Sequence, residues 1–126
     1  MKLSENFSLE EMLASETAAR MGISEQYEPS TLIINNLKSL CQIILQPIRE
    51  QIQTGIHISS GFRCNRLNTK VGGAKNSMHL FGMAADFIAT DKYDVDQLFK
   101  FVAKGNLPFD QIIHEFGRWV HISYDP

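Results

Sequence analysis

Two histidines and one aspartate are the residues of this chain best suited to chemistry. His79 and Asp86 lie seven residues apart, and His121 follows far downstream. Catalytic zinc ions typically take three ligands from His, Asp or Glu and leave a fourth position to water, whereas structural zinc sites are usually closed by cysteines. We therefore interpret His79, Asp86 and His121 as the ligands of an open zinc site in which the cysteines play no evident part.

The residues around these three candidates suit metal binding. Gly82 and the alanines that follow it are small, so they allow the backbone to turn tightly and approach an ion closely. His121 lies in the alternating stretch from Trp119 to Tyr124, which is typical of a β-strand. Taken singly, each candidate would be an ordinary histidine or a turn aspartate. The three together favour a metal site.

The elements that must position these residues begin with a helical N-terminal half. Ser8, followed three residues later by Glu11, predicts a capping box and a short helix. From Pro29 or Ser30 to about Gln53, apolar residues recur with helical spacing, and Pro47 should kink or break this helix.

The C-terminal half is predicted to mix strands with one helix. We expect strands at Ile56–Ser59 and Ala84–Ile88, the second carrying Asp86, and a helix from about Tyr93 to Lys104. A hairpin should pair Asp110–Glu115 with Trp119–Tyr124. The expected fold class is α+β, with the helical N-terminal half packed on a small antiparallel sheet that carries the zinc site.

Length and composition predict one compact domain. The chain has 126 residues, of which 44% are hydrophobic, and residues 1–126 therefore suit a single compact core. We expect it to act as a monomer. The formal net charge of -2 gives no basic footprint, so nucleic acid is not an expected partner.

We expect no membrane insertion and no signal peptide. No apolar stretch is long enough to span a bilayer, and Met1–Asn6 lacks the apolar run of a secretory signal. The expectation is synthesis as a soluble cytoplasmic protein; a chain from which a signal has been removed is the alternative. Cys41 and Cys64 could pair, but nothing in the sequence requires it, and reduced thiols are expected.

A larger motif surrounds the candidate ligands. The pattern Ser-x-His-x-x-Gly-x-Ala-x-Asp is matched at Ser77, His79, Gly82, Ala84 and Asp86. In this motif the chain resembles the zinc peptidases of peptidoglycan, which include D-Ala-D-Ala carboxypeptidases, D-Ala-D-Ala dipeptidases and L-alanyl-D-glutamate endopeptidases and share their fold with hedgehog signalling domains.

The resemblance extends over nearly the whole chain. Ser60–Arg63 resembles the family's Ser-Gly-Tyr-Arg, with Phe62 in place of tyrosine. The segments 7–11, 15–20 and 68–77 are similar to its small, phage-associated branch. The resemblance implies a Zn²⁺-dependent peptidase that hydrolyses a stem-peptide bond, of the D-Ala-D-Ala carboxypeptidase or L-Ala-D-Glu endopeptidase type, as a phage or prophage endolysin. Such a lysin would reach the cell wall only after another protein opens the membrane.

A zinc peptidase also needs a base for the attacking water, and the resemblance favours Glu115. Glu115 lies six residues before His121, the separation found in the hedgehog-like relatives. Many dipeptidases place their glutamate three residues before, where this chain has Arg118. Asp110 and His114 are the alternatives, and His114 should point to the strand face opposite Glu115.

Three further side chains are candidates for binding substrate. Arg63 offers a planar fork of donors for a carboxylate or carbonyl oxygen; a surface salt bridge is the alternative. Ser77 can form hydrogen bonds within the site and hold the segment that carries His79. Trp119 should share the strand face of His121 and form a wall of the pocket, unless it is a buried hairpin aromatic.

Two hypotheses from other classes stay open. The first is a zinc-stabilised binding or structural module of a phage particle that has the fold but no turnover. The second is a signalling-type domain whose metal site serves partner recognition, which the hedgehog-like fold permits. Glu115 and Arg63 argue against the first, and the short chain without a secretory signal argues against the second. The open metal motif favours an enzyme.

Overall fold

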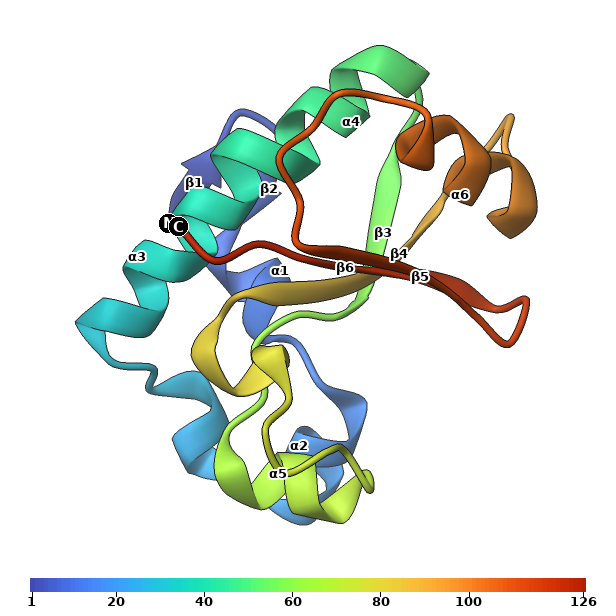
Figure 1. The fold of residues 1–126 in the computed structure, drawn as a ribbon. Helices are drawn as coiled ribbons and strands as arrows, with labels where there is room; N and C mark the ends of the chain where they lie inside the picture. Colours follow the sequence, from blue (N-terminus) through green and yellow to red (C-terminus); the bar gives the residue numbers. More distant parts are fainter.

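A four-stranded antiparallel sheet carries the candidate metal ligands (Figure 1). The structure, a computed structural model, describes residues 1–126. The strands follow the order β3-β4-β6-β5, so that β3 and β5 form the edges. Their bounds are β3 (Ile56–Ser60), β4 (Ala84–Ala89), β5 (Gln111–Glu115) and β6 (Trp119–Ser123). The strands and the hairpin predicted from the sequence are therefore confirmed, as is the α+β fold class.

The register of this sheet determines which residues share a face. In the β4–β6 pair Asp86 lies opposite His121, and in the β5–β6 pair Glu115 lies opposite Trp119. Side chains of directly opposed residues point to the same side of a sheet, and residues two apart along a strand do so as well. Asp86, His121, Trp119 and Glu115 therefore project from one face.

The helical N-terminal part begins with a small hairpin, β1 (Lys2–Ser4) and β2 (Phe7–Ser8), followed by α1 (Leu9–Leu13). The predicted capping box is present. The Ser8 hydroxyl accepts a hydrogen bond from the backbone N–H of Glu11, and the Glu11 carboxylate accepts one from the backbone N–H of Ser8. The helix α2 (Glu16–Met21) and the 3-10 turn η1 (Ser24–Tyr27) complete this part.

The long predicted helix is present but changes its winding. It consists of α3 (Thr31–Leu40), the π-helical segment η2 (Cys41–Leu45) and α4 (Gln46–Ile52). Proline lacks an N–H and its ring clashes with the carbonyl four residues earlier. The π-helical turn directly before Pro47 widens the helix there, and the backbone N–H of Gln46 donates to Cys41. The predicted disturbance at Pro47 thus takes the form of a π-helical turn, after which the helix continues.

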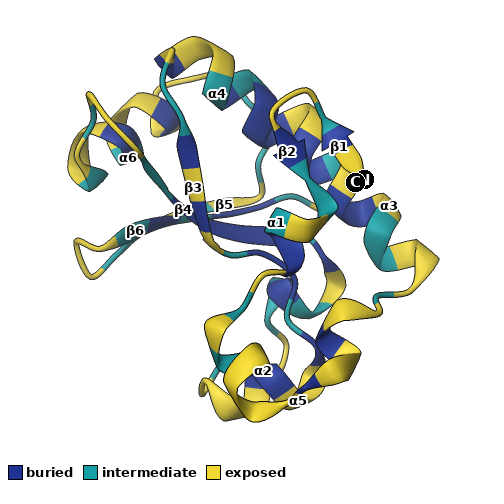
Figure 2. Cartoon of the chain, turned by 180° about the vertical axis from the view of Figure 1, so that it is seen from behind, coloured by how far each residue is buried: buried dark blue, intermediate teal, exposed yellow.

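The core lies between the sheet and these helices (Figure 2). The sheet face opposite the candidate ligands contributes Phe87, Val120 and Ile122, none of which is exposed. The helix α6 (Val95–Ala103) packs against β5 on that side and buries Leu98. It begins two residues later than predicted, because the Asp94 side chain caps it by accepting from the N–H of Gln97.

Two short helices lie on the side of the sheet that carries Asp86 and His121 (Figures 1 and 2). They are α2 and α5 (Asn65–Lys70), and the 3-10 turn η3 (Met78–Phe81) leads from them into β4. The sheet is therefore covered by a thick helical layer on its apolar face and by short segments on the polar one.

Gln26 connects these short segments and was not identified from the sequence. Its side chain is fully buried. The amide group donates to the carbonyl oxygens of Leu13 (2.9 Å) and Phe62 (2.7 Å) and accepts from the backbone N–H of Cys64 (2.9 Å). Gln26 thereby holds the backbone on both sides of Arg63.

The two cysteines are both free and buried, in agreement with the expected reduced thiols. Burial, with a smaller contribution from the charge of Glu11, raises the pKa of the Cys41 thiol to about 12. No helix combines the length and the apolarity that a membrane crossing requires.

Replacing Gln26 with leucine should destabilise the fold. The variant leaves three buried backbone groups without partners, so we expect the free energy of unfolding to fall by about 2–4 kcal/mol. Urea denaturation followed by circular dichroism measures this change. Gln51→Leu, at an exposed position on α4, is the matched control and should change stability by less than about 0.5 kcal/mol. Equal stabilities of the two variants would contradict the role of Gln26.

Candidate metal centre

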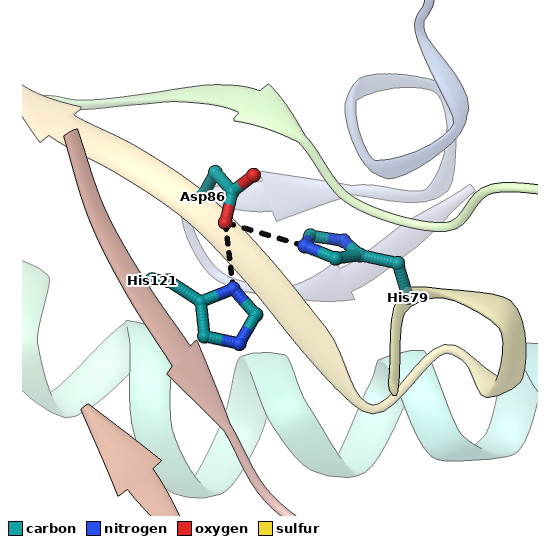
Figure 3. A group of neighbouring side chains, drawn as sticks. All are labelled: His79, Asp86 and His121. Carbon is teal, nitrogen blue, oxygen red and sulfur yellow. Dashed lines mark hydrogen bonds and ion pairs between the residues drawn. The ribbon is translucent and has the colours of Figure 1, made fainter. Parts of the chain in front are cut away.

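Three nitrogen and oxygen donors converge on one face of the sheet (Figure 3). Asp86 Oδ1 lies 3.2 Å from His79 Nε2 and 2.8 Å from His121 Nδ1. The donor atoms of the three residues all lie within 4.8 Å of one another. His79 and Asp86 are buried and His121 is partly exposed, so the cluster has a dry interior and an accessible side.

The segment that carries His79 is shaped by its flanking residues. The Ser77 hydroxyl accepts from the backbone N–H of His79 at 3.2 Å and caps η3. Gly82 ends the turn with a φ of +70°. A Cβ there would also lie 2.9 Å from the carbonyl oxygen of Ile33, so both the backbone conformation and the close approach to α3 require glycine.

A buried carbonyl group determines which nitrogen of His79 faces Asp86. His79 Nδ1 lies 2.7 Å from the carbonyl oxygen of Gly61. A carbonyl can only accept, so Nδ1 carries the proton and Nε2 of the neutral ring presents a lone pair. Gly61 itself lies against α1, where a Cβ would approach the carbonyl oxygen of Met12 to within 2.4 Å. The function of Gly61 was missed from the sequence, although it lies within the Ser60–Arg63 motif.

The donor set fits a zinc ion. In the neutral tautomer, the lone pair of His79 Nε2 and the Asp86 carboxylate are two acceptors that face each other, which calls for a cation or a proton between them. Tetrahedral zinc, with bonds of 2.0–2.1 Å, separates neighbouring ligand atoms by about 3.3 Å. The separation of 3.2 Å is close to this value, that of 2.8 Å is shorter, and all three ligand atoms lie within 4.8 Å of one another. Two imidazoles and one carboxylate are also the ligand types of open zinc sites.

Asp86 is poised to be negatively charged. Burial alone raises the pKa of its carboxyl group, but when the His121 and His79 rings are protonated, their hydrogen bonds to the carboxylate and their positive charges outweigh burial and lower the pKa to about 2. The carboxylate is therefore ionised at neutral pH, as a metal ligand must be.

Arg63 is held beside the cluster. Its Nη2 donates to the Ser77 hydroxyl at 3.2 Å, and its backbone N–H donates to the carbonyl oxygen of His79 at 3.0 Å. Nε is buried without a hydrogen-bond partner. Burial lowers the pKa of the guanidinium, and the charge of Asp86 acts in the opposite direction. The partner of Arg63 is a serine rather than an exposed carboxylate, which does not match the surface salt bridge considered as the alternative.

All the predicted site residues line one cleft of about 470 Å³. Besides the three metal-ligand candidates, its walls include Arg63, Ser77, Glu115 and Trp119. Glu115 and Trp119 are both half-buried, so Trp119 is not the buried hairpin aromatic considered as its alternative. Val71 and Phe116 also line the cleft and were not singled out from the sequence.

The two alternatives to Glu115 lie elsewhere. Asp110 is exposed, and its carboxylate accepts from the backbone N–H of Asp125 at 2.7 Å. His114 points to the opposite face of the sheet, where its ring lies 5.6 Å from that of Phe99 on α6. Neither residue lines the cleft, so Glu115 is the one of the three candidates that faces it.

A second cavity of about 400 Å³ adjoins this cleft. Both are lined by Arg63, Val71, Asp86 and Trp119. The second cavity extends from there towards Ser59 on β3 and the residues around the start of α2. The candidate metal ligands therefore lie along a groove and not at its closed end.

Comparison with known proteins supports a family relationship. The model of the family described as Peptidase M15 matches residues 5–123, which is nearly the whole chain. No curated protein matches the sequence.

Replacing a candidate ligand should weaken zinc binding. We expect His121→Ala to lower zinc affinity by at least about 100-fold, because loss of a direct ligand should cost at least as much as loss of a group that orients one. Isothermal titration calorimetry with zinc measures the change. His57→Ala is the control, since His57 is exposed on β3 outside both cavities. Equal zinc affinities of His121→Ala and the unaltered chain would contradict the assignment.

Zinc should also stabilise the folded protein through the same residues. A ligand that binds only the native state raises the free energy of unfolding, by about 2.7 kcal/mol when its concentration is a hundred times its Kd, and therefore raises Tm. Differential scanning fluorimetry should therefore show a zinc-dependent rise in Tm for the unaltered chain and for His57→Ala, but not for Asp86→Ala. A rise of the same size in Asp86→Ala would place the bound zinc elsewhere.

Proposed function

The chain belongs to the peptidase M15 family of zinc metallopeptidases, and on this premise we propose that it hydrolyses a peptide bond in the stem peptides of peptidoglycan. The observation that carries the proposal is the common cleft, in which a zinc-compatible donor set, an unpaired carboxylate and a guanidinium lie together. Residues 1–126 act in this proposal as one catalytic domain and as a monomer.

The metal would be held by His79 Nε2, His121 Nδ1 and the Asp86 carboxylate. Bound zinc supplies Lewis-acid chemistry, which lowers the pKa of water and polarises a carbonyl group. The chain contributes the orientation of the ligands. The hydrogen bond from His79 Nδ1 to Gly61 keeps Nε2 free of its proton, and the pairing of β4 with β6 keeps His121 beside Asp86.

Glu115 is the proposed general base. Its carboxylate takes a proton from the water that attacks the peptide carbonyl carbon, and it returns a proton to the amide nitrogen as the C–N bond breaks. The position of Glu115 on β5, opposite Trp119 on the ligand face of the sheet, supports this role. The hairpin turn that follows it fixes the backbone of Glu115, because the Arg118 N–H donates to the main-chain carbonyl of Glu115 at 2.9 Å.

Arg63 is proposed to bind the substrate through hydrogen bonds. Its guanidinium uses one nitrogen for Ser77 and keeps other N–H groups for a carbonyl or carboxylate oxygen. As negative charge develops on the carbonyl oxygen, these donors stabilise it. Ser77 contributes by holding both Arg63 and the backbone of His79, and Trp119 forms a wall of the cleft.

The groove favours cleavage of an internal bond. The two adjoining cavities share Asp86 and Arg63, so a peptide can extend to both sides of the metal site. A carboxypeptidase needs room for only one residue on one side. We therefore propose an endopeptidase, with the L-Ala-D-Glu bond of the stem peptide as the first substrate to test.

The resemblance to the small phage-associated branch supports an endolysin. In this proposal the chain is made in the cytoplasm and acts on the cell wall after release. One alternative, an inactive zinc-stabilised module of a phage particle, would keep the metal site but have no use for the carboxylate of Glu115.

Glu115→Gln should abolish turnover without loss of zinc. The amide keeps the shape of the side chain but cannot accept a proton from water, so we expect kcat to fall by about 10²–10⁴-fold. Asp110→Asn, which neutralises an exposed carboxylate next to β5, is the matched control and should keep full activity. Hydrolysis by Glu115→Gln at the rate of the control would remove Glu115 as the base.

Digestion of purified peptidoglycan should depend on the metal and yield internal fragments. We expect the zinc-loaded protein to release stem-peptide products with a free D-Glu amino terminus, and a chelator to stop the reaction. Mass spectrometry identifies the products. Release of single D-Ala residues would instead indicate a carboxypeptidase, and stoichiometric zinc without any product would favour the binding module.

A further inference from the structure

Phe116 is the most unusual residue on the surface of this chain. It lies at the tip of the β5–β6 hairpin, has a φ of +55°, and is 82% exposed. The next residue, Gly117, also has a positive φ, and the N–H of Arg118 closes the turn onto Glu115 at 2.9 Å. Two-residue hairpin turns with positive φ at both positions strongly favour Asn, Asp and Gly, so a bulky aromatic at the first position is strained.

The other two non-glycine residues with positive φ, Gln53 and Lys92, have structural reasons for this backbone conformation. Gln53 ends α4 in the left-handed conformation that commonly closes helices. Lys92 is held by a hydrogen bond from its N–H to the Asp91 carboxylate and by one from its ammonium group to Gln53. Phe116 has neither a helix end nor such a polar contact to explain its backbone conformation.

The position of Phe116 suggests a reason of another kind. Phe116 is one of the residues that line the cleft containing His79, Asp86 and His121. It also meets the Trp119 ring edge-on, with centroids 6.1 Å apart. Val71, which is 45% exposed, contributes a further apolar side chain to the same cleft from the segment after α5. The cleft thus combines polar groups at the metal site with exposed apolar side chains from two separate segments.

We propose that Phe116 is a substrate-binding residue that contacts the stem peptide beyond the cleaved bond. In the unbound protein the ring is exposed and its backbone strained, and strain of this kind tends to persist at functional sites. Contact with the substrate removes the ring from water. The substrate groups that suit contact with the Phe116 ring are apolar, namely the methyl groups of alanyl residues or the aliphatic part of a diamino acid side chain. The inference rests on the proposed function, because it assigns part of the same substrate.

The exposure of Phe116 makes its contribution depend on substrate length. A side chain at the outer end of the hairpin reaches a peptide that continues out of the cleft, whereas a dipeptide that spans only the cleaved bond stays near Glu115 and the metal ligands. Phe116 should therefore distinguish a stem pentapeptide from a dipeptide, which separates it from residues that act on the cleaved bond itself.

The test uses zinc-loaded protein that carries Glu115→Gln, so that binding is measured without turnover. Isothermal titration calorimetry gives the Kd of a synthetic stem pentapeptide and of the L-Ala-D-Glu dipeptide. The fluorescence of Trp119, the single tryptophan of the chain, reports contact at the hairpin. We expect Phe116→Asn to raise the Kd of the pentapeptide at least about fivefold and that of the dipeptide less than about twofold.

Phe116→Asn should also raise the Tm of the unbound protein by about 2–4 °C, because asparagine accepts a positive φ more readily.

Three further variants make the result specific. Phe116→Tyr keeps the ring and should retain pentapeptide binding. Leu32→Asn removes another exposed apolar side chain, on α3 away from the cleft, and should change neither Kd. Trp119→Phe tests whether the aromatic pair acts as a unit and should weaken pentapeptide binding.

The outcomes separate the two proposals. Pentapeptide binding that is unchanged in Phe116→Asn overturns the role of Phe116 and leaves the proposed peptidase intact. A pentapeptide Kd raised equally in Leu32→Asn, or not retained in Phe116→Tyr, also overturns it. Failure of the Glu115→Gln protein with an intact hairpin to bind either peptide contradicts the proposed substrate, and with it the inference.

Discussion

The pairing of β4 with β6 is the constraint on which the site depends. Asp86 and His121 come from distant parts of the chain, yet the antiparallel register places them directly opposite each other with Oδ1 and Nδ1 2.8 Å apart. A slip of one residue would move either side chain to the apolar face, where Phe87 and Val120 are fully buried. The hydrophobic core therefore fixes the register, and the register brings two of the three donors together.

The third donor depends on contacts between the short segments rather than on the sheet. The carbonyl of Gly61 orients His79, and Gly61 is itself pressed against α1. Gln26 holds the backbone at Phe62 and Cys64, on either side of Arg63. A single buried amide thus stabilises the segment that supplies both the acceptor for His79 and the guanidinium at the cleft. Stability and site geometry are coupled here through very few polar groups.

The sequence predicted much of this arrangement, for identifiable reasons. The strand around His121 follows from alternating apolar residues, and the first helix follows from the capping box at Ser8. The zinc assignment came from residue types whose chemistry is restrictive. Gln26 could not be predicted in the same way, because a glutamine in a polar segment gives no local signal of burial; its three partners lie 13 to 38 residues away. The π-helical turn before Pro47 and the strained backbone of Phe116 likewise arise from packing and turn geometry that periodicity does not encode.

Anomalous diffraction at the zinc edge, from crystals of the zinc-loaded protein, would show directly which residues bind the metal. We expect one strong peak within about 2.0–2.2 Å of His79 Nε2, His121 Nδ1 and an Asp86 oxygen, with a further position open towards the cleft. We also expect His79 Nδ1 to keep its hydrogen bond to Gly61. A peak at other residues, or a zinc ion whose four coordination positions are all taken by protein ligands, would contradict the assignment of an open site at His79, Asp86 and His121.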